Sequence, residues 1–595
     1  MRRMLAVLLL TFMALDTPAQ TRQGGGPPAG YWPLEKSAPL IEKMGETRLA
    51  PDLSHLGPGE RAALPKLLEV GKIFQALYER QRHPQAARAA ADLAALEGPA
   101  AANLATLYRL FQGPVATTLE NRREPFLSVD PPQPGKNVYP WGVKREELDA
   151  FMAANPGRRD EILDPRTVVR RATAEEARAD LDALARHPGL ALLHPGLRER
   201  LQAVAARPDP RGFYGVPYAV AYADETVRAH SLLREAADAA QSDDPEFAGY
   251  LRNRARDLLT NDYESGDASW VTGRFKNLNA QIGSYETYDD ELYGVKTFYS
   301  FSLLSTRREE SESLRRAMRG LQALEEALPY DRQKRVKEDI SVGAYDVVAD
   351  FGQSRGGNTA TILPNDALVS RRYGRTILLR ANIMRDREIF AGADRGWEAA
   401  VAPAHKDELT SDGNFYRTLW HEVGHYLGVD RTRDGRDLDA ALQENADLLE
   451  EMKADLVSLY VAPALRKQDY YTDAQLRAVY ASGINRVLQN NRPRRDQPYN
   501  TMQLMQWNYY LENGLLSFDR ATRRLSINYD RYHDVVAALL REVLKVQSEG
   551  DKAAADRFVE RYTKWDEELH GAVAAGIRAQ QRYRFRLFKY AALGE

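Results

Sequence analysis

The segment HEVGH, at residues 421–425, sets the strictest requirement on the structure of this chain. The surrounding stretch NFYRTLWHEVGHYLGV has apolar residues at steps of three or four, which predicts one helix with a buried stripe. On a helix, His421 and His425 lie about 40° apart around the axis, so both imidazoles can reach one metal ion. Glu422 can then reach a water on the open side of that ion without binding the metal itself.

Two histidines are too few ligands for a catalytic zinc, which usually takes three from the protein. A second predicted helix, ALQENADLLEEMKADLVSLY, carries carboxylates among apolar residues. Glu451 and Asp455 are four residues apart and share a face of this helix. A glutamate that binds the metal and an acid that accepts the second ring N–H of a histidine are expected at such a site. Glu450 could orient the other histidine in the same way.

The alternative to a metal site is an ordinary solvated helix, because HExxH alone recurs by chance. An apolar-flanked HExxH followed within thirty residues by EExxxD favours zinc. Gly424 adds to this, because glycine inside a helix costs about 1 kcal/mol relative to alanine and predicts the close approach of another backbone. We expect Ser411 or Asp412 to cap the first helix and Gly428 to end it.

Composition narrows the chemistry further. The chain of 595 residues has no cysteine, so a transition-metal site has to use histidine and carboxylate ligands. Lys and Arg total 82 against 84 Asp and Glu, which gives a net charge of -2 and no broad attraction to nucleic acid. We therefore expect neither a nucleic-acid partner nor a thiolate mechanism.

The first twenty residues, MRRMLAVLLLTFMALDTPAQ, have two arginines, a short apolar run and small residues near their end, as in a signal peptide. We expect cleavage near Ala19, export to a periplasm or the medium, and no stable membrane insertion afterwards. The alternative is a retained anchor, but the apolar run is short for a bilayer of roughly 30 Å. Residues 21–30 are rich in Gly and Pro and predict a flexible tether.

Helical periodicity dominates the rest of the chain, at 60–112, 172–260 and 530–565. Three runs rich in β-branched or aliphatic residues predict strands just before HEVGH, at 343–351, 359–364 and 375–384. The fold class is therefore mainly α with a smaller β component (α+β).

HEVGH with EEMKAD resembles the motifs of the dipeptidyl peptidase III family of zinc exopeptidases, as found in bacterial exported members. Further segments are similar to that family, so the resemblance covers about 130 to 570. They are YPWGVKREELDAFMAANPGRRDEILDPRTVVRR at 139–171, VPYAVAYADE at 216–225, IGSYETYDDELYGVK at 282–296 and ILPNDALVSRRYG at 362–374.

The resemblance implies a role for each matching residue. The zinc ligands are His421, His425 and Glu451, and Glu422 is the general base. Tyr288 donates its hydroxyl to the oxyanion, while Glu286 and Asn365 hold the α-amino group of the substrate.

Two departures from the family pattern bear on specificity. Ile362 stands where the family has an asparagine, which removes a polar contact to the substrate backbone. The family also has a histidine after its zinc helices, whereas this chain has none between His425 and His533. In the corresponding stretch, Tyr499 or Asn500 could take its place.

We expect two lobes separated by a cleft, with a helical zinc-binding lobe and a mixed α/β lobe that holds the substrate. The expected segments are 31–304 and 346–394 in the substrate-holding lobe, 305–345 and 395–548 in the helical lobe, and a C-terminal helical segment at 549–595.

The predicted function is hydrolysis of peptides near their N-terminus, with release of dipeptides, by a monomer that binds one zinc ion. Two alternatives remain open. One is a zinc aminopeptidase or oligopeptidase of broader specificity. The other is a catalytically silent peptide-binding protein with a structural zinc.

Overall fold

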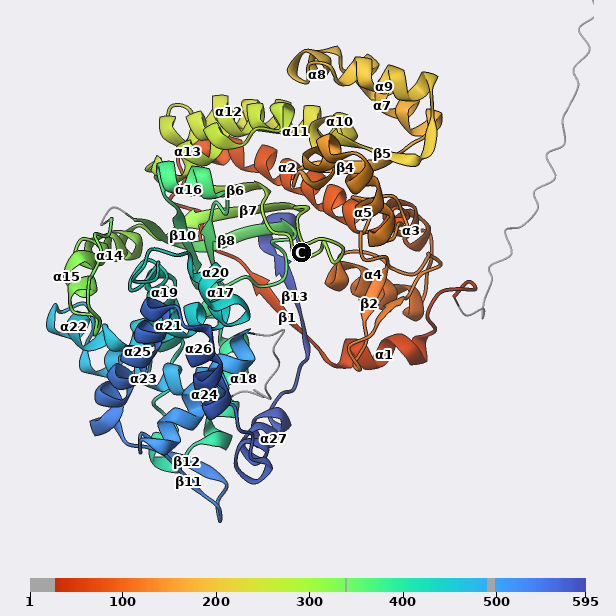
Figure 1. The fold of residues 1–595 in the computed structure, drawn as a ribbon. Coiled ribbons are helices and arrows are strands. Elements are labelled where there is room, and N and C mark those ends of the chain that lie inside the picture. The colour runs from red at the N-terminus through yellow and green to blue at the C-terminus, as the bar shows by residue number, and fades with distance from the viewer. Residues whose placement is uncertain (1–26, 338–339, 489–497) are drawn as a thin grey trace, which may run out of the picture.

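The structure, a computed structural model, describes residues 27–337, 340–488 and 498–595. The predicted signal peptide, its cleavage position near Ala19 and most of the tether lie outside these residues. As predicted, the fold is mainly helical with a smaller β component, arranged in two lobes (Figure 1). Within the described residues, no helix has both the length and the apolar character that a membrane crossing needs.

A five-stranded sheet lies at the junction of the two lobes (Figure 1). Its strand order is β6-β7-β8-β10-β9, and only the β8–β10 pair is parallel. The strands are β6 (Leu278–Ser284), β7 (Tyr299–Thr306), β8 (Ser341–Gly352), β9 (Ala360–Leu363) and β10 (Thr376–Arg380).

The structure confirms the first two predicted strands and corrects the third, which ends at Arg380. The chain then forms the short helix α17 (Ala381–Met384). The Asn382 side chain accepts a hydrogen bond from Val347 N at 2.9 Å and donates one to Val347 O at 3.1 Å. A side-chain amide thus makes the contacts to β8 that the backbone of a longer strand would have made.

Strand β10 is buried on both faces, which explains its unbroken aliphatic run. Leu378 belongs to one apolar core, and Ile377 and Leu379 belong to the other. We call the lobe around the first core the sheet lobe and the lobe around the second the helical lobe. The sheet therefore separates two hydrophobic cores and contributes side chains to each.

The sheet lobe is covered by long helices, of which α11 packs on both α2 and α12. Helix α2 lies so close to β8 that a Cβ at Gly71 would come within 2.2 Å of the Phe351 ring. The principal helices are α2 (Pro58–Arg82), α5 (Arg145–Ala154), α7 (Ala174–Arg186), α9 (Leu197–Ala206), α11 (Ala223–Ala240), α12 (Pro245–Thr260) and α13 (Glu264–Thr272).

Two further features belong to the N-terminal part of this lobe. A third, smaller apolar core is formed by α1 (Leu34–Glu42), α3 (Ala86–Ala94), α4 (Pro99–Phe111) and their neighbours. Strand β4 (Thr167–Ala172) pairs in antiparallel fashion with β5 (Asp209–Pro217). Strand β5 interrupts the stretch 172–260, in which helical periodicity was predicted to dominate.

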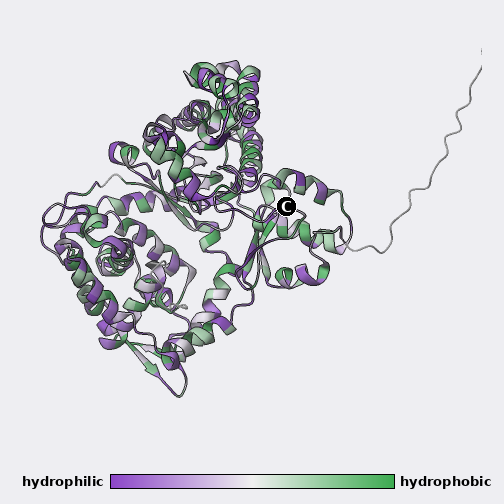
Figure 2. Ribbon diagram, turned by 45° about the vertical axis from the view of Figure 1, so that its right-hand side comes forward, coloured by the Kyte–Doolittle hydropathy of each residue, from purple (hydrophilic) through white to green (hydrophobic). Residues whose placement is uncertain are grey.

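In the helical lobe, α19 packs on α21 and α23, and α21 also packs on α24 and α25. Figure 2 shows hydrophilic and hydrophobic residues mixed along these helices, as expected for amphipathic segments around a core. The helices are α14 (Arg308–Met318), α15 (Leu321–Glu326), α18 (Arg387–Ala400), α19 (Ser411–Gly424), α20 (Leu438–Leu442), α21 (Ala446–Tyr460), α22 (Ala462–Lys467), α23 (Asp473–Val487), α24 (Pro498–Glu512), α25 (Tyr532–Glu549), α26 (Lys552–Tyr562) and α27 (Ala572–Ala579).

The end of the chain differs from the helical segment predicted at 549–595. After α27 the chain returns to the sheet lobe, where β13 (Phe585–Tyr590) pairs in parallel with β1 (Met44–Leu49). Glu595 then forms ion pairs with Arg109 at 2.8 Å and Arg355 at 3.5 Å. A six-residue strand whose partner lies near the other end of the chain leaves little local signal in the sequence.

Candidate metal centre and substrate-facing residues

Helix α19 carries both histidines, but its ends differ from those predicted. Thr410 is the N-cap, and its hydroxyl accepts a hydrogen bond from Gly413 N at 3.0 Å. Asp412, one of the two expected caps, instead forms an ion pair with Arg385 at 2.6 Å. The helix ends at Gly424 rather than at Gly428, so His425 occupies the C-cap position with φ −67° and ψ −23°.

Gly424 has the close backbone contact that its place in a helix predicted. A Cβ at this position would lie 2.8 Å from both Cα and O of Ala454 on α21. Real Cβ atoms essentially never come that close to backbone atoms. Helices α19 and α21 therefore touch backbone to backbone beside the two histidines.

The structure brings His421, His425 and Glu451 together. Glu451 Oε2 lies 3.2 Å from His421 Nε2 and 3.8 Å from His425 Nε2. Their potential ligand atoms all lie within 4.8 Å of one another, which makes the three a group that could hold a metal ion. Glu451 Oε2 is buried, and His421 Nε2 at 3.2 Å is not aligned well enough to satisfy it, as expected of a carboxylate oxygen whose partner is a metal. Two imidazoles and a carboxylate form a donor set that suits zinc.

A carboxylate contacts Nδ1 of each histidine ring, the nitrogen that faces away from Glu451. His421 Nδ1 lies 2.8 Å from Asp455 Oδ1, and His425 Nδ1 lies 3.0 Å from Glu450 Oε1. These contacts leave both Nε2 atoms facing Glu451. Carboxylate–histidine pairs of this kind fix the ring orientation and make a better metal ligand.

Cations packed around these two carboxylates keep them ionised. Burial alone would raise the pKa of Asp455, but Arg486, His421 and Arg417 outweigh it and hold that pKa well below its usual range. The Arg417 guanidinium donates to Asp455 Oδ1 at 3.0 Å. Burial likewise acts to raise the pKa of Glu450, yet Lys453, 2.8 Å away, and His425 lower it to about 2.

The charges around the candidate centre also shift the pKa of His421 in the metal-free chain. Burial lowers its pKa, but the charge and hydrogen bond of Asp455 outweigh burial and raise the pKa to about 9. Because a metal binds the neutral imidazole, a metal ion competes here with a proton.

Glu422 is half-buried beside these groups. Burial is the largest influence on the pKa values of His421, Tyr426 and Tyr499, lowering the first and raising the other two; the charge of Glu422 is a smaller influence that raises all three. The Glu422 carboxylate therefore lies close to His421, Tyr426 and Tyr499.

Tyr499, at the start of α24, belongs to the centre, although its sequence pattern could not place it there. Burial raises its pKa, and so do the charge of Glu451 and its hydrogen bond with that carboxylate. The Arg486 guanidinium lies 5.3 Å from the centre of the Tyr499 ring. This hydroxyl thus reaches the candidate ligand Glu451 in the stretch where the family histidine is missing.

The predicted substrate-holding residues form a separate group on the sheet lobe. Glu286 and Tyr288 lie in the loop between β6 and β7, and Asn365 follows β9. Asn365 Nδ2 donates to Glu286 Oε2 at 3.2 Å. Tyr288 is 82% exposed and shares a hydrogen bond with Glu286. Although the side chain is largely exposed, the surrounding protein partly desolvates the hydroxyl and so raises its pKa; Glu286 raises that pKa further, and the charge of Glu451 on the other lobe does so to a smaller extent.

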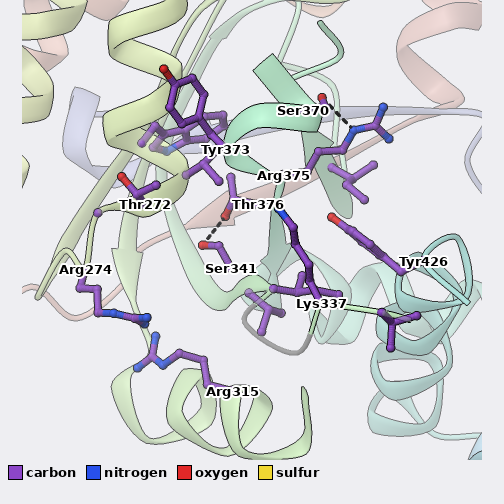
Figure 3. Close-up of a pocket in the computed structure, with 18 of the residues that line it drawn as sticks. Thr272, Arg274, Arg315, Lys337, Ser341, Ser370, Tyr373, Arg375, Thr376 and Tyr426 are labelled. Atoms are coloured by element: carbon purple, nitrogen blue, oxygen red, sulfur yellow. Dashed lines mark hydrogen bonds between the residues drawn. The ribbon is translucent and has the colours of Figure 1, made fainter. Parts of the chain in front are cut away.

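A cavity of about 1120 Å³ opens beside the candidate centre (Figure 3). Residues of both lobes line it, among them Trp270 from the sheet lobe and His425 and Tyr426 from the helical lobe. Half-buried Ile362, the residue that departs from the family pattern, also lines this cavity.

Solved structures with the same architecture are known. The structure of DPP III from Caldithrix abyssi matches 93% of this chain and 98% of its own, with a TM-score of 0.79 and 23% sequence identity. The structure of dipeptidyl-peptidase III from Corallococcus sp. strain EGB matches 94% of this chain and 98% of its own, with a TM-score of 0.72 and 22% sequence identity. The fold is that of dipeptidyl peptidase III.

Sequence comparison adds less than the dipeptidyl peptidase III fold does. No family model matches the chain. A curated protein named Nudix hydrolase 3, from Arabidopsis thaliana, is 25% identical over 357 residues, which is 59% of this chain. The chain spans 46% of the length of that protein, so its name says little about the part that aligns.

Proposed function

We propose that the protein is a zinc-dependent peptidase of the dipeptidyl peptidase III family that releases dipeptides from the N-terminus of peptides. The observation that carries this proposal is the group of His421, His425 and Glu451, with a carboxylate on Nδ1 of each ring. The dipeptidyl peptidase III fold supports it, and the group lies on the helical lobe beside a cavity that residues of both lobes line.

His421, His425 and Glu451 would hold the ion, oriented by Asp455 and Glu450. Zinc at this position supplies a Lewis acid that polarises the scissile carbonyl and lowers the pKa of water. Glu422 accepts the proton of the attacking water and passes it to the departing amine, as a carboxylate beside an open metal position can do.

The sheet-lobe group would set where the peptide is cut. The Glu286 carboxylate, with the Asn365 amide beside it, binds a protonated α-amino group through charge-assisted hydrogen bonds. Tyr288 donates its hydroxyl to the oxyanion that develops on the scissile carbonyl. If Glu286 anchored the α-amino group two residues' length from a zinc ion held by His421, His425 and Glu451, the second peptide bond would be the one that is cut.

Mass spectrometry of the products from matched peptides with free and acetylated N-termini tests this proposal. We expect dipeptides from the free peptides and at least about tenfold slower cleavage after acetylation, because acetylation removes the charge that Glu286 binds. Glu286→Gln should reduce this discrimination, and chelation should abolish activity until zinc is restored. Equal rates on free and acetylated peptides would exclude the dipeptidyl mechanism.

The alternative of a broader aminopeptidase or oligopeptidase is favoured by one observation, Ile362, which offers no polar contact to a substrate backbone. Single amino acids or internal fragments among the products would support it. A silent peptide-binding protein with a structural zinc would release no products while retaining the metal. Export, one zinc ion per chain and a monomeric state are further parts of the proposal.

A further inference from the structure

We propose that the cavity beside His425 binds the anionic part of a peptide substrate, namely the acidic side chains and C-terminal carboxylate beyond the bond that is cut. This inference rests on the proposed peptidase function and names its substrate class. It starts from the charge of the cavity wall.

The described residues that line the cavity include nine lysines and arginines but only Glu312 and Asp430 as carboxylates. The segment just before β8 contributes three of the cations. The others come from the loop after α13, from α14 and its C-terminus, and from α16 (Ala367–Tyr373) with the loop that follows, and they are Arg274, Arg315, Arg316, Arg319, Arg371 and Arg375. This imbalance contrasts with the nearly neutral chain as a whole.

These cations have few partners. Among the described residues, Lys334 pairs with Asp430 at 3.4 Å, and no carboxylate lies within ion-pair distance of the six arginines. Arg274, from the loop after α13, and Arg315, from α14, extend toward each other (Figure 3). Two like charges that face each other across a concave surface raise its positive potential, which an anionic ligand would relieve.

Helix geometry accounts for only part of this arrangement. Arg315 and Arg316 lie in the last turn of α14, where cations offset the negative end of the helix dipole. Arg319 is the C-cap of the same helix, but the remaining cations come from the loop after α13, the segment before β8, and α16 with the loop that follows it. The wall therefore has the character of a binding surface rather than of one favourable helix end.

The cavity is also placed for the C-terminal part of a substrate. His425 lines it, whereas Glu286 and Asn365 are not among its lining residues. A peptide whose α-amino group is held by Glu286 and which passes the metal centre would carry its remaining residues toward these arginines. The negative Glu286 and the positive cavity then match the two ends of a zwitterionic peptide.

The test uses peptides of equal length that differ by Glu or Gln at positions after the cut. For the full-length protein we expect a kcat/KM about tenfold higher for the Glu peptide at low ionic strength, and a smaller ratio at high salt. Arg315→Glu combined with Arg319→Glu should lower the ratio about tenfold, and the milder pair of Gln variants should lower it less. Arg308→Glu, at an exposed position of the same helix but outside the cavity, is the matched control and should leave the ratio unchanged.

Equal kcat/KM values for the Glu and Gln peptides would overturn the inference. So would an Arg308→Glu control that lowers their ratio as much as the Arg315 and Arg319 variants do. Replacing the C-terminal carboxylate by an amide separates the two anionic sources, since only binding of the terminus is sensitive to it. Dissociation constants of the same peptides for Glu422→Gln measure binding without turnover. The Glu422→Gln variant could bind the Glu peptide more tightly than the Gln peptide while the unmodified protein hydrolyses neither. That outcome would reject the proposed function and keep the inference.

Discussion

The helical lobe and the sheet lobe hold their candidate functional residues in different ways. In the helical lobe, His421 is buried, and the partners of both histidines are themselves tied to Arg417, Arg486 and Lys453. In the sheet lobe, Tyr288 and Asn365 are exposed and bond mainly to Glu286. One lobe thus carries a pre-organised candidate metal centre, whereas the other carries groups whose proposed partner is the substrate.

The largest effect should follow from Glu422→Gln, which leaves the donor set of the helical lobe intact. We expect kcat to fall about 10³-fold, because the change removes a general base, while the zinc content stays the same. Metal analysis with steady-state kinetics on a free peptide provides the measurement. Glu309→Gln, at an exposed position on α14, serves as the control.

Retention of full activity by Glu422→Gln would show that the metal is structural. The helical lobe would then hold a structural metal and no catalytic group, and the two lobes would no longer differ in catalytic role.

A smaller effect should follow from Asp455→Asn. This variant tests how much the buried hydrogen bond to His421 Nδ1 contributes to metal affinity. Zinc affinity should fall about 10- to 100-fold, measured by competition with a chelator. In the metal-free chain the raised pKa of His421, about 9, contributes stability that is complete below pH 6.5. That contribution is lost as the pH rises through 9. The variant should therefore show a smaller fall in the free energy of unfolding between pH 6.5 and 9.

Glu450→Gln provides the matched comparison on the same helix. Its carboxylate is partly exposed, with a relative side-chain exposure of 32% against 4% for Asp455. We expect a weaker loss of zinc affinity, and equal losses would contradict the role assigned to burial.

The smallest effect should come from Tyr288→Phe in the sheet lobe. We expect kcat to fall about tenfold with no change in zinc content, because the lost hydroxyl acts only on the bound substrate. Tyr293→Phe in the same loop, whose hydroxyl contacts Asp149, is the control. A change in metal affinity would show that the two lobes are coupled more tightly than their contacts suggest.

The same contrast explains what the sequence could predict. His421 and His425, like Glu451 and Asp455, are four residues apart on helices, so a local period was enough to place them on one face. The N-cap of α19 was missed because Thr410, Ser411 and Asp412 can all cap a helix, and the ion pair of Asp412 with Arg385 depends on tertiary structure. Tyr499 was left unassigned because its hydrogen bond with Glu451 likewise depends on tertiary structure.

Strands were harder to predict than helices. The runs that became β8 and β9 were recognised from their composition, whereas β10 stopped early because the Asn382 side chain replaces a backbone partner. Strands β5 and β13 have partners that local periodicity does not reveal. The basic cavity arises from several separate segments, none of which forms a long charged run in the sequence.

The contact between Gly424 and Ala454 has a consequence for how such a centre can vary. One histidine pair and one glutamate sit on two helices whose separation depends on the absence of a single side chain. Enlarging residue 424 would push the helices apart and lengthen the reach from Nε2 to the Glu451 carboxylate. Selection of one ion size over another is therefore open to adjustment by a residue that never touches the ion.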